Sequence, residues 1–295
     1  MVVLVTGANG QLGQSLQFIA SNYPEFHFVF CSSSDLDITN LENCQTVFSK
    51  IKPNYCINAA AYTAVDKAES EPEKASLINV VGAKNLAEEC KHHSTILLHI
   101  STDFVFDGNR VVTSSEVETP YTEKDITNPT GVYGQTKLDG EKAIQAVFDN
   151  YYIIRTSWIY SQFGNNFMKT MLRLASERDS ISVVNDQIGT PTNAVDLAEV
   201  LIKIICHPER SRGTINNYGI YNFSNEGQCS WYDFAKKIFE INNITIDLKP
   251  IPTSSFPTAA KRPKYSVLDK SKIKNTFGIE IKSWEESLKT IRILK

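Results

Sequence analysis

The chain has 295 residues, of which 42% are apolar and 21% are charged, and these values exclude the disordered and fibrous classes of protein. A net charge of -3 argues against a nucleic-acid-binding scaffold, and no apolar run approaches the ~20 residues of a membrane span. The six cysteines show no CxxC spacing, and the first predicted strand begins at Val2, so no signal peptide is expected. We therefore predict a cytoplasmic protein with reduced cysteines and no membrane attachment.

Apolar runs alternate with segments of helical periodicity through the first half of the chain. The predicted strands are 2–6, 26–31, 55–58, 95–101 and 152–156. The predicted helices between them are 11–22, 41–50, 72–92 and 130–148. This alternation predicts an α/β fold with a doubly wound parallel sheet of the Rossmann type.

The pattern changes after Thr156. Residues 158–166 are typical of a loop, and the elements predicted after it are helices at 167–176, 195–206 and 231–241 and a strand at 181–184. We therefore predict a Rossmann domain over 1–157, which also receives part of 181–210. A smaller α+β substrate-binding domain is predicted over 158–295.

A glycine-rich turn joins the first predicted strand to the first predicted helix. Gly7, Gly10 and Gly13 have the spacing G-x-x-G-x-x-G. Glycines at such a turn allow the backbone to approach a pyrophosphate, which then lies at the positive end of the helix dipole. Position and spacing together predict a site for a nicotinamide dinucleotide.

The end of the second predicted strand bears on which dinucleotide binds. An NAD-selective site usually places an acid there to hold the ribose 2′-hydroxyl, whereas this chain has Cys31 followed by three serines. The pattern favours NADPH or the use of both cofactors, so NADPH and NADH both stay open. Asp37 and Ile38 are close enough in sequence to reach the adenine side of the cofactor.

Tyr133 and Lys137 are four residues apart in the predicted helix 130–148 and therefore share a helical face. The pKa of a free tyrosine is near ~10, and a nearby ammonium is expected to lower it. The pair can then protonate an oxygen while hydride arrives at the adjacent carbon. Lys137 is also suited to hold the nicotinamide ribose.

Polar residues follow the fourth predicted strand, at the sheet edge where ligands bind in this kind of fold. The hydroxyl of Thr102 can hydrogen-bond a substrate carbonyl and complete a Thr-Tyr-Lys triad. Ser101 is the competing candidate, because alternation along the strand does not separate the two. Asn79, on the predicted helix 72–92, is a candidate for holding Lys137 through a water molecule.

Eight segments carry a resemblance to a known family. They are GANGQLG at 7–13, NAAAYTAVDKAESEPEKA at 58–75, STDFVFDG at 101–108, YGQTKLDGE at 133–141, RTSWIY at 155–160, GNNFMKTMLRLA at 164–175, NDQIGTPT at 185–192 and PTAAKRPKYSVLD at 257–269. Through these segments the chain resembles the extended short-chain dehydrogenases over nearly its full length, and among them the dTDP-4-dehydrorhamnose reductases.

The resemblance implies reduction of the 4-keto group of a dTDP-6-deoxy-4-ketohexose, with NADPH or NADH as the cofactor. It implies Tyr133 as the proton donor, with Lys137 and Thr102 as its partners. The residues implied at the cofactor are Gly7, Gly10, Gln11, Leu12, Gly13, Asp37, Ile38, Ala61, Tyr62, Thr63, Tyr133 and Lys137. The residues implied at the sugar nucleotide are Asp103, Phe104, Trp158 and Arg262, whose guanidinium suits a diphosphate.

Two departures from the family pattern affect these expectations. Phe104 stands where the family often has Tyr, which removes one substrate hydrogen bond. Some members dimerise through magnesium held by acids, and Gln14, Ser15 and Val195 stand where such acids are expected, so no metal is predicted. The partner expected is a dTDP-sugar, without nucleic acid, and a homodimer is the candidate assembly.

Other functions stay open beside this one. The substrate could be another nucleotide 6-deoxy-4-ketosugar. A dehydratase is disfavoured, because those enzymes resemble this chain but have an Asp-Glu pair where Asp103 is followed here by Phe104. A non-catalytic subunit similar to the regulatory subunit of methionine adenosyltransferase belongs to a different class, and the intact Thr102, Tyr133 and Lys137 argue against it.

Overall fold

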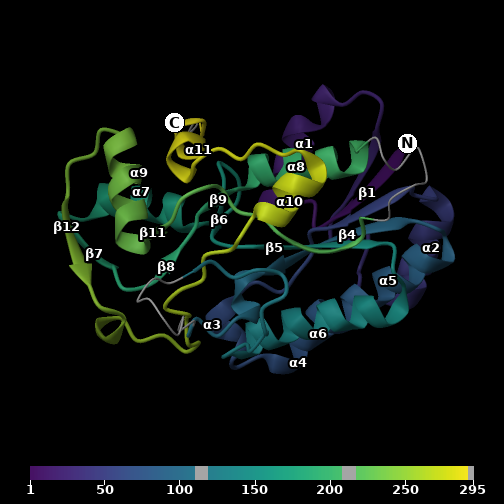
Figure 1. Cartoon of the computed structure of the whole chain (residues 1–295), viewed down its shortest axis with the longest axis horizontal. Helices are drawn as coiled ribbons and strands as arrows, with labels where there is room; N and C mark the ends of the chain where they lie inside the picture. The colour runs from purple at the N-terminus through teal and green to yellow at the C-terminus, as the bar shows by residue number, and fades with distance from the viewer. Residues whose placement is uncertain (110–118, 208–216, 292–295) are drawn as a thin grey trace.

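The computed structural model describes residues 1–109, 119–207 and 217–291. A central sheet lies between two layers of helices, with a smaller group of helices and short strands beside it (Figure 1). The sheet has six strands in the order β10-β5-β4-β3-β1-β2, all of them parallel. Their bounds are β1 (Val2–Thr6), β2 (His27–Cys31), β3 (Tyr55–Asn58), β4 (Ile96–Thr102), β5 (Tyr151–Thr156) and β10 (Gly219–Asn222).

The predicted doubly wound parallel sheet is confirmed, and it contains one strand more than the five predicted. β10 comes from the second half of the chain and pairs with β5, where Tyr221 lies opposite Ile154. The strand order reverses between β1 and β3, because β2 lies on one side of β1 and β3 on the other. Ligands of such sheets bind at the carboxyl ends of the strands beside this reversal.

Side chains of the strands alternate between two apolar cores, as the period of a strand requires. Val3, Val5 and Ile57 belong to one core, whereas Leu4 and Cys56 belong to the other, and all are fully buried. Both faces of the sheet are therefore covered, which explains why its strands have continuous apolar sequences.

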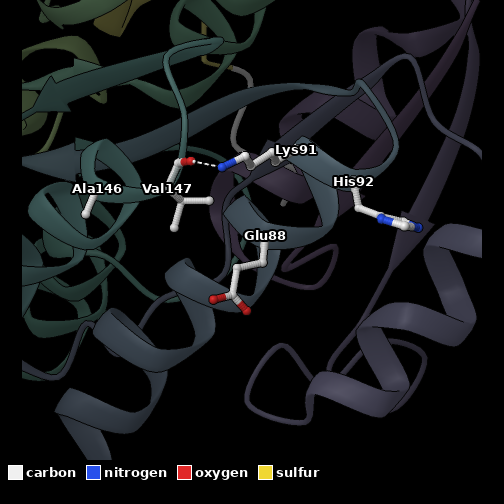
Figure 2. Close-up of a pocket in the computed structure, with 5 residues that line it drawn as sticks. All are labelled: Glu88, Lys91, His92, Ala146 and Val147. Atoms are coloured by element: carbon white, nitrogen blue, oxygen red, sulfur yellow. Dashed lines mark hydrogen bonds between the residues drawn. The ribbon is translucent and has the colours of Figure 1, made fainter.

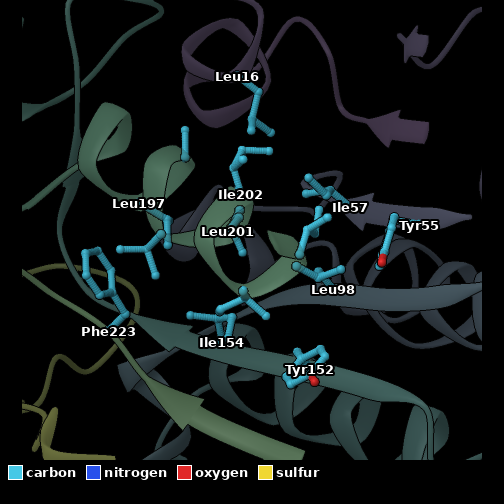
Figure 3. Packing of buried hydrophobic residues seen from close by; sticks show 14 of the residues in the cluster. Leu16, Tyr55, Ile57, Leu98, Tyr152, Ile154, Leu197, Leu201, Ile202 and Phe223 are labelled. Atoms are coloured by element: carbon cyan, nitrogen blue, oxygen red, sulfur yellow. The ribbon is translucent and has the colours of Figure 1, made fainter. Parts of the chain in front are cut away.

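The first core lies under α1 (Gln11–Ile19), α8 (Ala194–Cys206) and α10 (Ser271–Phe277). Leu16 of α1 and Leu197 of α8 face Ile57, Leu98 and Ile154 of the sheet (Figure 3). The side chain of Asn193 accepts a hydrogen bond from Val195 N at 2.9 Å and so begins α8 as an N-cap. A helix from beyond residue 158 thus covers the sheet.

The second core lies under α2 (Leu41–Ile51), α5 (Gly82–His92) and α6 (Val132–Val147). Lys91 Nζ donates to the carbonyl oxygen of Val147 at 2.9 Å, so the ends of α5 and α6 are tied together (Figure 2). The pocket at this point is lined by Glu88, Lys91, His92, Ala146 and Val147. Because α5 and α6 end just before β4 and β5 begin, the pocket lies at the amino edge of the sheet, opposite the edge where ligands bind.

The predicted helix 72–92 is interrupted by one wider turn. It consists of α4 (Pro72–Ser76), a π-helical turn (Leu77–Val81) and α5. Asn79, in the π-helical turn, is buried, and turns of this kind often mark functional sites.

A smaller lobe is formed by α7 (Phe167–Glu177), β7 (Ser180–Val184), α9 (Trp231–Ile241), β12 (Asp247–Ile251) and α11 (Trp284–Lys289). β7 and β12 pair in parallel, and Met168, Phe234 and Trp284 pack in the core of this lobe. The short elements are α3 (Val65–Ala68), β6 (Ile159–Tyr160), β8 (Ile188–Gly189), β9 (Thr192–Asn193), β11 (Cys229–Ser230) and the 3₁₀ turns Ala20–Asn22, Asp103–Val105 and Thr253–Ser255.

The division of the chain at residue 157 stays a prediction. Residues 208–210, the end of the range expected to return to the sheet, lie outside the described residues. In the part of the chain that the structure describes, no helix has both the length and the apolar character needed to cross a membrane.

Candidate active site

The glycine loop closes tightly around the start of α1. Gly7 has φ +67°, and a Cβ at this position would lie 2.7 Å from backbone atoms of Ala59 and Ala60. A Cβ at Gly13 would lie 2.7 Å from Ala8, so neither glycine can be replaced without moving backbone. No side chain caps α1, and its first turn holds no acid, which leaves the amides of this turn for an anion. The loop therefore fits a dinucleotide pyrophosphate.

The side chain of Gln11 is engaged by the protein itself. Its Oε1 accepts from Ser161 Oγ at 3.1 Å and from Asn166 Nδ2 at 2.9 Å. Its Nε2 donates to the carbonyl oxygen of Ile159 at 3.3 Å. Gln11 thus joins the glycine loop to residues 159–166, and its backbone amide is the part that can meet a cofactor.

An acid that the sequence reasoning missed lies at the end of β2. Asp35 folds back, and its Oδ2 accepts from Ser32 N at 2.9 Å and from Ser32 Oγ at 2.6 Å. These hydrogen bonds lower the pKa of Asp35, so its carboxylate is charged at neutral pH. The nearby Asp37 uses Oδ1 to accept from Thr39 N at 2.9 Å, and Ile38 is buried. The loop after β2 therefore does contain an acid, four residues past the end of the strand.

The loop after β3 is fixed by Asn79. Asn79 Oδ1 accepts from Tyr62 N at 2.9 Å, and Asn79 Nδ2 donates to Tyr62 O at 3.2 Å and to Thr136 Oγ1 at 3.0 Å. Asn79 therefore positions the neighbours Ala61 and Thr63 as well as Tyr62. Asn79 is predicted to hold Lys137 through a water molecule. Its amide nitrogen does not make that contact, because both of its protons are donated to Tyr62 and Thr136.

The structure separates Ser101 from Thr102. Ser101 Oγ donates to Glu141 Oε1 at 2.5 Å, and Glu141 forms a buried ion pair with Arg155 at 2.7 Å. Thr102 Oγ1 instead donates to Asp103 Oδ1 at 3.0 Å and lies within hydrogen-bonding reach of the Tyr133 hydroxyl. The threonine, rather than the serine, therefore faces Tyr133.

The pKa of Tyr133 shifts in the direction opposite to the one predicted. Burial raises it to about 12, with Asp103 adding to the rise and the hydrogen bond with Thr102 opposing it. The expected lowering is wrong, because desolvation of the hydroxyl is the largest influence on this pKa and outweighs the lowering by the hydrogen bond with Thr102. Tyr133 therefore holds its proton firmly at neutral pH, as a proton donor must.

Lys137 is almost fully buried, with 2% of its surface exposed. Its Nζ donates to the carbonyl oxygen of Ile100 at 2.6 Å and lies 3.4 Å from His99 Nε2. Burial lowers the pKa of Lys137 to about 8, while Glu141 acts to raise it. The contact between His99 and Lys137 was missed in the sequence, where these residues are 38 positions apart.

The residues predicted at the sugar nucleotide have different surroundings. Asp103 is buried, which raises its pKa to about 6, and the ring of Phe104 lies edge-on to that of Tyr133 at 5.6 Å. Trp158 stacks on Trp231 at 3.5 Å between ring centroids and has φ +46°, a strained backbone for a residue with a side chain. Strain of this kind often accompanies functional sites.

Arg262 is held by an acid that the sequence reasoning did not single out. Its Nη1 and Nη2 donate to the two oxygens of Asp66 at 3.0 and 2.8 Å. Ala260 N also donates to Asp66, at 3.1 Å. The neighbouring Glu69 accepts from Val132 N at 2.8 Å and so caps the start of α6. Glu69 thus holds the start of α6, the helix that carries Tyr133 and Lys137, and Asp66 holds the segment 257–269.

These groups converge because each follows the carboxyl end of a strand. The glycine loop follows β1, residues 59–63 follow β3, Thr102 ends β4 and Trp158 comes after β5. The carboxyl ends of parallel strands meet at one edge of the sheet, so the loops form one crevice. Fold and site together are those of a nicotinamide-dependent oxidoreductase.

Comparison with known proteins agrees with this class. The family described as RmlD substrate binding domain matches residues 1–293. The chain is 43% identical to a dTDP-4-dehydrorhamnose reductase of Aggregatibacter actinomycetemcomitans, over 98% of both chains. It is 38% identical to the Escherichia coli K12 reductase of the same name, over 98% of this chain and 96% of that one. The chain therefore belongs to the RmlD family, that of the dTDP-4-dehydrorhamnose reductases.

Solved structures agree at the level of the fold. A dTDP-4-dehydrorhamnose reductase from Clostridium acetobutylicum is 44% identical and superposes with a TM-score of 0.90, over 98% of this chain and 97% of that chain. One from Bacillus anthracis, solved in complex with NADP, is 41% identical with a TM-score of 0.89, over 97% of this chain and 96% of that chain. The likeness extends over both the sheet and the smaller lobe.

Proposed function

We propose that the chain reduces the 4-keto group of dTDP-4-dehydrorhamnose to give dTDP-L-rhamnose, with NADPH or NADH as the hydride source. One observation carries the proposal: Thr102, Tyr133 and Lys137 lie at the carboxyl edge of the sheet, in a chain 43% identical over 98% of its length to a reductase of that name. The Bacillus anthracis relative, which was solved in complex with NADP, supports a nicotinamide cofactor for this chain.

The glycine loop and Lys137 are the groups proposed to bind the cofactor. The uncapped amides at the start of α1 would face the pyrophosphate, and Gly7 and Gly13 allow its close approach. Lys137 would hold the nicotinamide ribose. The bound cofactor supplies the hydride that forms the new C–H bond at carbon 4 of the sugar.

Tyr133 is the proposed proton donor to the carbonyl oxygen. Because burial raises the pKa of Tyr133 to about 12, its hydroxyl keeps the proton until negative charge develops on the substrate oxygen. The O–H bond of the product then forms as the tyrosine O–H bond breaks. Thr102 orients the tyrosine hydroxyl, and the ammonium form of Lys137 stabilises the phenolate that is left.

The substrate contacts proposed are Asp103, Phe104, Trp158 and Arg262. Phe104 packs on Tyr133 and would shape the sugar pocket, and the Arg262 guanidinium would add a diphosphate contact beside its ion pair with Asp66. Location in the cytoplasm and assembly as a homodimer are further predictions.

The test is turnover with enzymatically generated dTDP-4-ketosugar, with NADH and NADPH compared and the product identified by NMR. Cofactor oxidation with formation of dTDP-L-rhamnose is expected. If the cofactor is oxidised only with a different ketosugar nucleotide, that compound is the substrate instead. Absence of oxidation with every ketosugar nucleotide, together with a stable protein partner, would replace the enzyme by a regulatory subunit.

A further inference from the structure

His99 is a buried imidazole next to the reactive groups, and the mechanism above does not use it. It lies in β4 with 1% of its surface exposed. Its Nδ1 is 2.9 Å from Asn58 Nδ2 of β3, and its Nε2 is 3.4 Å from Lys137 Nζ of α6. The imidazole therefore bridges the centre of the sheet and the lysine.

The orientation of the Asn58 amide is fixed by a backbone donor. Ala60 N donates to Asn58 Oδ1 at 3.2 Å, and Thr6 Oγ1 donates to the same oxygen at 2.7 Å. A backbone N–H can only donate, so the atom facing Ala60 is the amide oxygen. The amide nitrogen must then be the atom that faces His99.

This orientation determines the tautomer of His99. The Asn58 nitrogen has protons and no free lone pair, so His99 Nδ1 must accept. Burial lowers the pKa of His99 well below its usual range, and the charge of Lys137 lowers it further, so the ring is neutral. A neutral imidazole with an unprotonated Nδ1 has its proton on Nε2, which is the nitrogen that faces Lys137.

The Nζ atom of Lys137 therefore faces a hydrogen-bond donor, the Nε2–H group of His99. An ammonium at Nζ can donate to the carbonyl oxygen of Ile100 at 2.6 Å, but it gains nothing from the N–H of His99. A neutral amine at Nζ can accept that N–H through its lone pair. Glu141, one turn further along α6, is a charged group that acts on Lys137 and favours its ammonium form, and Glu141 is itself paired with Arg155 of β5.

We propose that His99 is a positioning residue for Lys137: fixed by Asn58 as the tautomer protonated at Nε2, it presents an N–H to the lysine and favours the amine form over the ammonium form. The ammonium of Lys137 can then pass a proton to the Tyr133 phenolate: one Nζ–H bond breaks, the tyrosine O–H bond is restored, and the amine that is left takes up a proton from solvent water. This role deepens the proposed reduction and rests on it for its catalytic meaning, whereas the tautomer itself does not depend on any activity.

The first test is NMR of the full chain labelled with ¹⁵N-histidine, which gives five imidazoles to distinguish. The His99 signals are assigned by their loss in His99→Asn. We expect a neutral ring protonated at Nε2 at neutral pH. A ring protonated at Nδ1, or at both nitrogens, overturns the proposal whether or not the protein turns over any substrate.

The second test is the pH profile of kcat/KM in His99→Asn. The asparagine oxygen still accepts from Asn58, but the shorter side chain cannot reach Lys137. The ionisation assigned to Lys137 should move up by about one pH unit, the scale of losing one hydrogen bond to the neutral form. His92→Asn, an exposed histidine at the end of α5, is the matched control and should leave the profile in place.

The outcomes separate the two proposals. Lower activity of His99→Asn with an unshifted profile would mean that His99 acts only on folding, which overturns its role toward Lys137. A wild-type chain without reductase activity would contradict the proposed function, and the NMR result would still decide the tautomer.

Discussion

The guanidinium of Arg262 and the carboxylate of Asp66 form a two-pronged ion pair, with N–O distances of 3.0 and 2.8 Å, across 196 residues of sequence. The pair joins the segment after β12 to α3, beside the loop that follows β3. Side-chain exposure is 26% for the arginine and 45% for the aspartate, so solvent screens the pair and its own contribution to stability is small. Its main effect is therefore to hold the guanidinium in one place.

Replacing Arg262 tests its proposed contact with the diphosphate. Arg262→Ala should raise the KM for the dTDP-sugar roughly tenfold or more, the scale of a charge-assisted hydrogen bond, with little change in kcat. Asp66→Asn keeps the guanidinium and should raise KM less. Steady-state kinetics of both variants make the comparison, and an unchanged KM in Arg262→Ala would remove the residue from the site.

Tyr133→Phe removes the proposed proton donor and leaves the ring in place. We expect kcat to fall by roughly 100-fold or more, the scale of general-acid catalysis, with the Kd of the cofactor nearly unchanged. Single-turnover kinetics and cofactor fluorescence provide the two measurements. Tyr232→Phe, on α9 of the smaller lobe, serves as the control. Full activity of Tyr133→Phe would mean that another group donates the proton.

Asp103→Asn should make the protein more stable at alkaline pH. Burial raises the pKa of Asp103 to about 6, so the native state favours the protonated form, and stability is lost as rising pH ionises the carboxyl. The variant has no charge to bury, and its advantage should grow from near zero at about pH 4 to at most roughly 3 kcal/mol at about pH 8. Denaturant unfolding of both proteins across this range measures the difference. A constant difference at every pH would argue against the ionisation of Asp103 as its cause.

Asp35→Ser should shift the cofactor preference toward NADPH. The charged carboxylate of Asp35 lies against Ser32 at the end of β2, where the adenosine ribose binds in this fold, and it would repel a 2′-phosphate. Removing one such charge should raise the ratio of kcat/KM for NADPH to that for NADH by about tenfold, or about 1.4 kcal/mol. Asp149→Ser, at the amino edge of the sheet, is the control. An unchanged ratio would place Asp35 away from the ribose.

The parallel sheet could be predicted because its signal is local. Each of the first five strands is an apolar run of four to seven residues between helical segments, and the predicted bounds differ from the observed ones by one residue at most. β10 has the sequence Gly-Ile-Tyr-Asn, which is not a continuous apolar run, and it is placed by pairing with the edge of β5, far away in sequence. The π-helical turn was not predicted either, and the contact that Asn79 in this turn makes with Tyr62, 17 residues earlier, is not visible in the periodicity.

Residue types at the site could be predicted, but their partners could not. Tyr133 and Lys137 are found from their spacing, and Gly7 from its position after a strand. Whether Ser101 or Thr102 faces the site depends on Glu141 and Arg155. Glu141 accepts the hydrogen bond of the serine hydroxyl, and Arg155 neutralises the carboxylate of Glu141. The pKa of Tyr133 depends on burial, which a short motif does not contain. Such contacts arise only when distant segments fold together.

The position of β10 in the sequence, more than 60 residues after the other five strands, affects how the chain can be divided. A fragment that ends at residue 157 would lack β10, α8 and α10, so the full length of β5 would be an open edge, and of the three helices over the first core only α1 would remain. Open edges and bare apolar faces promote association between copies of a chain. We expect such a fragment to aggregate when it is made alone. During synthesis, the six-stranded sheet can be completed only after residue 222, the last residue of β10, has been added.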